Sequence, residues 1–367
     1  MTDSATFQLE TLDVNGSPAE LGRGQGEAFR ERIQRFVDMR FEAMKGYFAD
    51  RGRPTEWTQV IDAGRAGLGI YEGWDKDGHD ELKGIAEGSG IDFDRLFTAT
   101  NMTDFRDAVL LREASGEPLR KLNDEGCSSV LVPTSASSTG YAIAGQTWDL
   151  NPPDIEYVVA IRRRPLEGPE TWAVTCAGCL TLMGINEYGL SVGTTNIKTY
   201  GSRPGVGYLS ILHRAVRAMD VSEARELVRK APHSGAHTYW LADESQQIEY
   251  EASPNGQYLR TTEDGPIFRT NHCITPQHVA LQGEVVGESS TARFARLGEV
   301  LSEPTDPAGL RTLFSDRSDG TESINRYEED GMGTATNAVF IAEPAKRRAS
   351  ACRGPADRGE WIDLTFD

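Results

Sequence analysis

The stretch GCSSVLVP, residues 126–133, divides the chain into two parts of different character. Before it, apolar residues recur every three or four positions, which is the spacing of helices that bury one face. After it, short β-type runs are separated by turn residues, which is typical of a large antiparallel sheet system. We therefore expect an α+β protein in which helices and stacked sheets form layers.

The part before residue 126 predicts three helical stretches and a linker. One apolar stripe over residues 28–44 predicts a helix of about 20–25 residues. A second stretch covers about 57–87, with a glycine break inside it, and a third covers about 94–112. The polar and charged segment 112–126 then predicts an exposed linker.

Helix starts are also marked in the second part. Asp220 followed by Glu223 forms a capping-box pattern. Asp306 before Pro307 pairs an N-cap residue with a first-turn proline. We expect a helix after each of these pairs and a strand in each of the two closing apolar runs.

Acidic residues outnumber basic residues by 56 to 38, for a net charge of −18. Nucleic acids and anionic membranes attract clustered positive charge, so we expect neither as a partner. No apolar run approaches the roughly 18–20 residues of a spanning helix, and the first residues lack the basic and apolar pattern of a secretory signal. Five cysteines are too few, and odd in number, for a disulfide framework, which favours a cytoplasmic location.

Cys127 is the first candidate for chemistry because a cysteine is the most nucleophilic ordinary side chain near neutral pH. The preceding Gly126 leaves its carbonyl uncrowded, so the thiol could attack that carbonyl and form a thioester. Hydrolysis would free Cys127 as a new N-terminus, whose amino group, with a pKa of about 7.7–8.0, could act as a base beside the thiol. The alternative is a buried structural cysteine at the start of a strand.

Three polar residues stand at the ends of β-type runs that follow Cys127 in the chain. Asp149 ends the run GQTWD and could bind a terminal ammonium, whereas Asn196 and Asn271 end the runs GTTN and RTN. Asparagine side chains can donate hydrogen bonds to a developing oxyanion. Each of the three also fits an ordinary turn or cap residue. The adjacent His272 is better interpreted as structural than as a base, because neighbouring strand residues point to opposite faces.

Two other motifs carry less weight. Cys176-Ala-Gly-Cys179 has the spacing of a redox or zinc half-site, but the chain has no second such pair and a zinc site needs about four ligands. We therefore favour two small buried cysteines and expect no metal. The glycine-rich stretch GRGQGE, residues 22–27, lacks the Lys-Ser/Thr ending of a phosphate-binding loop.

The motifs GCSS, GQTWD, GINEYGL followed by TTN, RTNH and STARFARL occur in this order along the chain. In this combination the sequence resembles the penicillin acyltransferase-type (acyl-coenzyme A:6-aminopenicillanic acid acyltransferase) family of N-terminal-nucleophile hydrolases. The resemblance implies a single four-layer αββα sandwich domain over residues 1–367. It also implies a precursor that cleaves itself between Gly126 and Cys127, into an α chain of residues 1–126 and a β chain of residues 127–367.

The resemblance further implies roles for individual residues. Cys127 would be both the self-cleavage residue and the catalytic nucleophile, Asp149 would position the nucleophile region, and Asn271 would contribute to the oxyanion hole. Asn196 and Arg293 match positions of the related bile-salt-hydrolase-like branch, which implies oxyanion or substrate binding.

The match to that branch is incomplete. Thr147 stands where the family motif has asparagine, and Gln146 stands where the bile-salt type has arginine, which weakens a bile-salt assignment. We expect a self-processing cysteine amidohydrolase or acyltransferase that needs no cofactor. Its substrate would be a small acyl amide or acyl thioester.

An alternative from another class is an unprocessed, catalytically idle relative that binds a small molecule. For the enzyme, the α and β chains of one precursor are the expected partners. A homo-oligomer of that pair is left open.

Overall fold

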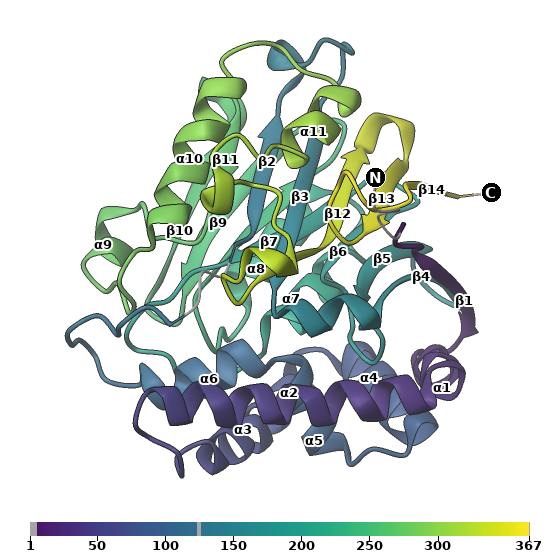
Figure 1. The fold of residues 1–367 in the computed structure, drawn as a ribbon. Coiled ribbons are helices and arrows are strands. Elements are labelled where there is room, and N and C mark those ends of the chain that lie inside the picture. Colours follow the sequence, from purple (N-terminus) through teal and green to yellow (C-terminus); the bar gives the residue numbers. More distant parts are fainter. Residues whose placement is uncertain (1–5, 123–125, 367) are drawn as a thin grey trace.

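The computed structural model describes residues 6–122 and 126–366. Two sheets are stacked face to face, and helices cover the outer face of each sheet (Figure 1). The protein is therefore an α+β four-layer αββα sandwich, as expected. Among the described residues, no helix combines the length and the apolar character needed to cross a bilayer.

The larger sheet has eight strands in the order β1-β4-β5-β6-β7-β8-β9-β10. β1 pairs parallel with β4, and the other neighbours are antiparallel. Its strands are β1 (Glu10–Gly16), β4 (Val158–Pro165), β5 (Thr171–Cys176), β6 (Met183–Asn186), β7 (Ser191–Asn196), β8 (His237–Ala242), β9 (Gln247–Ser253) and β10 (Gly256–Thr261).

The smaller sheet has six strands in the order β11-β2-β3-β12-β13-β14, all antiparallel. Its strands are β2 (Ser128–Val132), β3 (Ile143–Leu150), β11 (Ile267–Arg269), β12 (Ala335–Glu343), β13 (Arg348–Arg353) and β14 (Ile362–Thr365). β2 and β3, which carry the GCSS and GQTWD motifs, are thus direct neighbours in the interior of this sheet.

The helices form the two outer layers. Helices α1 to α6 lie together along one side of the molecule in Figure 1, whereas α10 and α11 pack on the smaller sheet. The helices are α1 (Pro18–Ala28), α2 (Arg30–Asp50), α3 (Thr58–Trp74), α4 (Lys76–Ser89), α5 (Phe93–Thr100), α6 (Met102–Leu110), α7 (Tyr208–Ala215), α8 (Val221–Lys230), α9 (Pro276–Val279), α10 (Glu288–Val300) and α11 (Pro307–Phe314).

The smaller sheet is buried on both faces, which explains its nearly continuous apolar strands. Along β12, Phe340 belongs to the core between the sheets, whereas Val339 and Ile341 belong to a second core beneath α11. Because successive strand residues point to opposite faces, each strand must supply apolar side chains to both cores. The run at 335–343 is accordingly buried throughout.

Both predicted helix caps in the second part are confirmed. The Asp220 carboxylate accepts a hydrogen bond from the Glu223 N–H at 2.9 Å, and the Asp306 carboxylate accepts one from the Gly309 N–H at 2.7 Å. The prediction of one helix over 94–112 is wrong, because the chain breaks at Asn101 between α5 and α6. There the Asn101 side-chain amide donates to the Phe97 carbonyl, in competition with the helical backbone.

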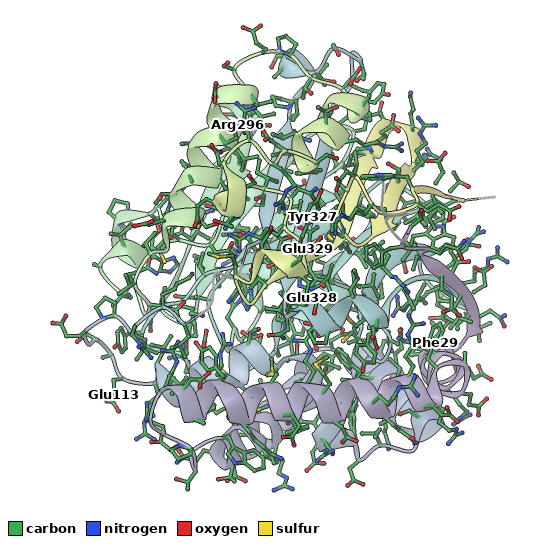
Figure 2. All side chains as sticks on the ribbon, viewed as in Figure 1. Phe29, Glu113, Arg296, Tyr327, Glu328 and Glu329 are labelled. Atoms are coloured by element: carbon green, nitrogen blue, oxygen red, sulfur yellow. The ribbon has the colours of Figure 1, made fainter. Side chains whose placement is uncertain are left out.

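The segment after α6 is the predicted linker. Residues 112–118 are exposed, and Glu113 points outward at one end of the helical layer (Figure 2). The segment then attaches to a distant loop, where the Leu119 N–H donates to the Gly283 carbonyl and the Val285 N–H donates to the Leu119 carbonyl. The rest of the predicted linker, residues 123–125, lies outside the described residues.

The glycine-rich stretch 22–27 lies within α1 and serves helix packing. A Cβ at Gly22 would lie 1.9 Å from the Glu81 carbonyl oxygen of α4, and one at Gly84 would lie 2.3 Å from the Ala19 carbonyl oxygen of α1. Glycine is needed at these positions because the two backbones touch.

We expect Gly22→Ala to destabilise the protein by about 1–3 kcal/mol, because the added methyl group forces the α1 and α4 backbones apart. Urea unfolding followed by circular dichroism measures the effect. Gly46→Ala in α2 is the control, since a Cβ there meets nothing within 4 Å. The control should raise the free energy of unfolding by up to about 1 kcal/mol, and equal effects of the two substitutions would contradict the packing argument.

Candidate active site

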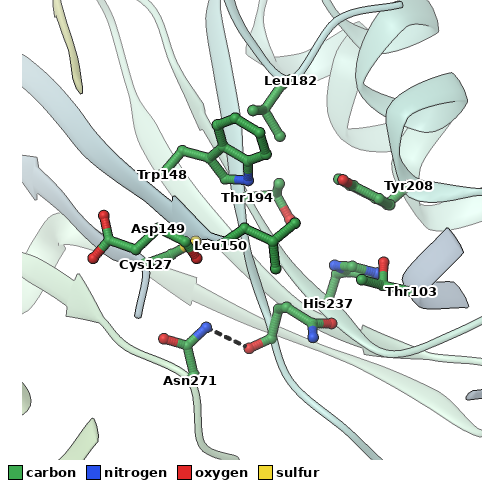
Figure 3. Close-up of a pocket in the computed structure, with 11 residues that line it drawn as sticks. Thr103, Cys127, Trp148, Asp149, Leu150, Leu182, Thr194, Tyr208, His237 and Asn271 are labelled. Atoms are coloured by element: carbon green, nitrogen blue, oxygen red, sulfur yellow. Dashed lines mark hydrogen bonds between the residues drawn. The ribbon is translucent and has the colours of Figure 1, made fainter. Parts of the chain in front are cut away.

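A small cavity lies beside the start of β2 and the end of β3 (Figure 3). Its volume is about 20 Å³, which is room for one or two water molecules. Eleven residues line it, and four of them are residues that the sequence predicts for the site: Cys127, Asp149, Asn196 and Asn271. Segments far apart in the chain thus bring the predicted residues together.

Cys127 precedes β2 and is buried, with 6% of its surface exposed. Its Sγ lies 3.8 Å from the main-chain oxygen of Asp149, and the Gly126 N–H donates to the same oxygen at 3.4 Å. This arrangement follows from the register of β2 and β3, in which Ser128 pairs with Thr147. Because the strands are antiparallel, the residue two back from Ser128 lies opposite the residue two on from Thr147, so Gly126 lies opposite Asp149. The register of β2 and β3 therefore sets the position of the thiol.

Arg293 of α10 does not line the cavity, but it is fully buried and contacts residues that do. Its Nη1 donates to the Cys127 carbonyl at 2.6 Å and to the Ser128 hydroxyl at 3.0 Å, and its Nη2 donates to the Asn271 Oδ1 at 3.1 Å. A guanidinium is a rigid fork of donors, so it can hold several acceptors in fixed geometry. The geometry makes Arg293 a positioning residue for Cys127 and Asn271.

The Asn271 side chain is oriented by these contacts. Since Oδ1 faces Arg293, the amide NH₂ points the other way, and it donates to the Asn196 main-chain oxygen at 3.0 Å. An amide nitrogen carries two hydrogens, so a second N–H is available to a ligand. The Asn271 backbone is held by its N–H donating to the Ser290 hydroxyl at 3.0 Å.

The Asp149 carboxylate points away from the cavity in Figure 3 and is almost completely buried. Burial raises the pKa of Asp149 to about 6, against the lowering effects of the Arg326 and Arg293 guanidinium groups and of the Thr336 and Thr147 hydroxyls. A buried carboxyl group loses hydration in its charged form, and the two cations restore only part of that loss.

Arg326 belongs to this site, although no sequence pattern marks it. It is buried and donates to the Thr334 hydroxyl at 2.7 Å and to the Ser289 hydroxyl. A Cβ at Gly126 would lie 2.9 Å from both the Arg326 Nε and the Asp149 Oδ2. A larger residue at position 126 would therefore displace the carboxylate and the guanidinium group that lie beside it.

The sequence also missed the cavity residues on α6, α7 and β8: Thr103, Tyr208 and His237. The residues next to His237 in the sequence do not indicate a cavity, because the cavity is completed by helices that lie far away in the chain.

His272 lies outside the cavity lining. Its Nδ1 is 2.8 Å from the Ser290 hydroxyl, its ring packs against Phe294, and burial together with Arg269 and Arg293 lowers its pKa to about 4. These contacts support the structural interpretation.

The Cys176 and Cys179 thiols are both buried. Burial raises the pKa of Cys179 to about 12 and that of Cys176 well above its usual range. Because the thiolate is the reactive and metal-binding form, these values disfavour redox or metal chemistry there. The described parts of the chain hold no group of three or more His, Cys, Asp or Glu residues placed to bind a metal ion.

Solved structures with some likeness to the chain include a hydrolase and an acylase. A mutant of conjugated bile acid hydrolase from Clostridium perfringens is 13% identical, covering 66% of this chain and 97% of its own, with a TM-score of 0.38. Penicillin V acylase from Agrobacterium tumefaciens is 11% identical, covering 68% of this chain and 81% of its own, with a TM-score of 0.32.

No curated protein matches the sequence. A family model does: the one described as Acyl-coenzyme A:6-aminopenicillanic acid acyl-transferase matches residues 137–357. This span covers more than half of the chain and includes Asp149, Asn196, Asn271 and Arg293, whereas Cys127 lies ten residues before it. The chain belongs to the acyl-coenzyme A:6-aminopenicillanic acid acyl-transferase family.

Proposed function

We propose that this protein is a self-processing N-terminal-nucleophile enzyme that uses Cys127 to cleave or transfer the acyl group of a small amide or thioester. One observation carries the proposal. A thiol that follows a glycine, a buried carboxyl group and an oriented amide donor meet at one cavity, in a member of an acyltransferase family.

Self-cleavage would begin with attack of the Cys127 Sγ on the Gly126 carbonyl carbon. The peptide C–N bond breaks as the thioester forms, and the Cys127 nitrogen takes up a proton. Water then hydrolyses the thioester, which leaves a carboxylate on Gly126 and a free thiol and amine on Cys127. The products are an α chain of residues 1–126 and a β chain of residues 127–367.

The new amine would form beside Asp149. A Cβ at Gly126 would lie 2.9 Å from the Asp149 Oδ2, so the nitrogen of the next residue, Cys127, would be freed close to a buried carboxylate. An α-amino group has a pKa of about 7.7–8.0, so near neutral pH it can give up its proton and then accept the thiol proton. Asp149 would orient this base and stabilise its charged form.

In catalysis, the Cys127 sulfur attacks the substrate carbonyl and the second N–H of Asn271 donates to the oxyanion. The leaving amine or thiol departs with the proton held by the Cys127 amine, and the acyl group remains as a thioester on Cys127. Water or an acceptor amine then attacks this thioester. Hydrolysis and acyl transfer thus share every step up to the last.

The small cavity supports the idea of an inactive precursor. Ligand pockets are typically about 300–1,000 Å³, far larger than the 20 Å³ found beside Cys127. Lys121, five residues before Gly126, lines a second small cavity that shares Asn196 and Asn271. Movement of Lys121 away from these residues after cleavage would make room for a substrate.

The proposed enzyme works with side chains and its own amine, so the mechanism calls for no cofactor. Its free cysteines, all five of which are buried, support a location in the reducing cytoplasm. Its small-molecule partner would be an acyl amide or acyl thioester.

We expect purified protein to give two species of 126 and 241 residues, the larger beginning with Cys127. Intact-mass analysis and N-terminal sequencing measure this directly, and Cys127→Ala should remain full length and inactive. A full-length wild-type species that still cleaves amides would contradict the role of the N-terminal amine. A full-length species without activity would favour the idle, small-molecule-binding alternative.

We expect Asn271→Asp to lower kcat roughly 10²–10³-fold, because the oxyanion loses its donor. One carboxylate oxygen still faces Arg293, whereas the other loses the bond to the Asn196 carbonyl, so circular dichroism and intact mass must verify that the fold and the chain cleavage persist. Turnover of a chromogenic acyl amide measures kcat. Unchanged turnover in this variant would remove Asn271 from the oxyanion role.

We expect Asp149→Asn, made in the uncleavable Cys127→Ala protein, to change the pH dependence of stability. Because burial raises the pKa of Asp149 from 3.8 to about 6, the folded state binds its proton more tightly than the unfolded state. With Asp149 present, the free energy of unfolding should fall by up to about 3 kcal/mol as the pH rises from 4 to 7. Urea unfolding of both proteins should show this fall only with aspartate, and parallel profiles would contradict the assignment.

A further inference from the structure

The cavity has a second polar end, on the side away from Cys127. In Figure 3, Cys127 and Asp149 lie on one side of the cavity, and Thr103, Tyr208 and His237 lie on the other. These last three residues have between 2% and 8% of their surface exposed. This end of the cavity is therefore closed to solvent.

Asp104 holds the polar end in place. Its Oδ1 lies 3.2 Å from the His237 Nε2, and its Oδ2 accepts the Tyr208 N–H at 2.9 Å. Gly235 lets the carboxylate approach, since a Cβ there would lie 2.4 Å from the Asp104 Oδ1. The Tyr208 ring stacks on the His237 ring with centroids 4.5 Å apart. The imidazole is thus fixed from two sides.

The contact with Asp104 also determines what His237 offers to a ligand. A carboxylate only accepts hydrogen bonds, so the proton of the neutral imidazole lies on Nε2 and the Nδ1 is an acceptor. Within residues 6–122 and 126–366, this buried Nδ1 has no hydrogen-bond partner, and neither has the buried Thr103 Oγ1. Leaving buried polar atoms without partners is costly. Two such atoms on the lining of one cavity indicate a place for a polar group of a ligand.

The chemistry at Cys127 indicates which part of the substrate reaches this end. The substrate carbonyl must lie between Cys127 and Asn271. The leaving group must depart and the acceptor must enter while the acyl group stays bound, so both need the more open side. Asn196 is only half-buried there and borders the second cavity. The acyl group is left with the closed side, past the apolar Trp148 and Leu182.

We propose that Thr103, His237 and Asp104 form the acyl-specificity site of this enzyme. The site selects a short acyl group with an apolar body and a hydrogen-bond donor, a hydroxyl or an amine, at its far end. The His237 Nδ1 accepts from that donor, and the Thr103 hydroxyl adds a second bond. Because Thr103 and Asp104 belong to residues 1–126, the proposed α chain would supply part of the specificity of a nucleophile on the β chain. This inference rests on the proposed function.

Matched substrates test the inference on the processed wild-type enzyme. We would compare 4-nitroanilides of unsubstituted, ω-hydroxy and ω-amino acyl chains of two to four carbons, which suit the small closed end, and take the ratio of kcat/KM for a donor-ended chain over the methyl-ended chain of equal length. The wild type should prefer one donor-ended series by about tenfold or more. Which series is preferred separates a hydroxyl ligand from an amine ligand.

Variants then locate the preference. Thr103→Val and His237→Phe should each lower the ratio about tenfold, whereas Thr103→Ser, which keeps the hydroxyl, should retain it. Thr175→Val is the matched control, since the Thr175 hydroxyl on β5 is also buried and unpartnered in the described structure but lies outside the cavity lining. Its ratio should equal that of the wild type.

The outcomes separate the two proposals. A wild type that cleaves all series equally, with a ratio that Thr103→Val leaves unchanged, would overturn the specificity site and leave the proposed function intact. A processed chain that cleaves none of the anilides or the corresponding acyl thioesters would overturn both.

Discussion

The buried guanidinium group of Arg293 is the interaction on which the rest of the site depends. It donates to the carbonyl of Cys127 and to the side-chain oxygen of Asn271, so one rigid group sets both the backbone of the thiol and the direction of the amide donor. A cation without water is stable only where hydrogen bonds and opposite charge replace its hydration. The Ser289 hydroxyl and the nearby Asp149 carboxylate provide these. The bonds to Cys127, Ser128 and Asn271 add to this compensation.

The same electrostatics connect the site to the proposed cleavage. Asp149 lies near two guanidinium groups, yet burial still raises its pKa to about 6, so its charge is incompletely compensated in the intact chain. The proposed cut would create an ammonium group on Cys127 where Gly126 now touches this carboxylate. One broken bond would then supply the catalytic base and the missing positive charge together.

Two features of the fold would keep the proposed chains together. β1, which precedes the Gly126-Cys127 bond, pairs over seven residues with β4, which follows it. The largest core also contains side chains from α2 and from the strands of both sheets. No local pattern predicted β1, because it is a half-exposed edge strand whose partner lies almost 150 residues away. The break at Asn101 was likewise missed, because the backbone angles of this residue leave the helical range although its N–H still donates to the Phe97 carbonyl.

The sequence by itself determined the features that neighbouring residues control. These are the change from helical to strand periodicity at residue 126, the helix cap at Asp306, and the order of motifs that indicates the family. Only the tertiary structure decided which polar groups meet. Arg293 bonds to Cys127 across 166 positions, and Asp104 lies 133 positions from His237. The physical reason is that periodicity and capping act within one or two turns of chain, whereas a buried polar group finds its partner through the packing of whole layers.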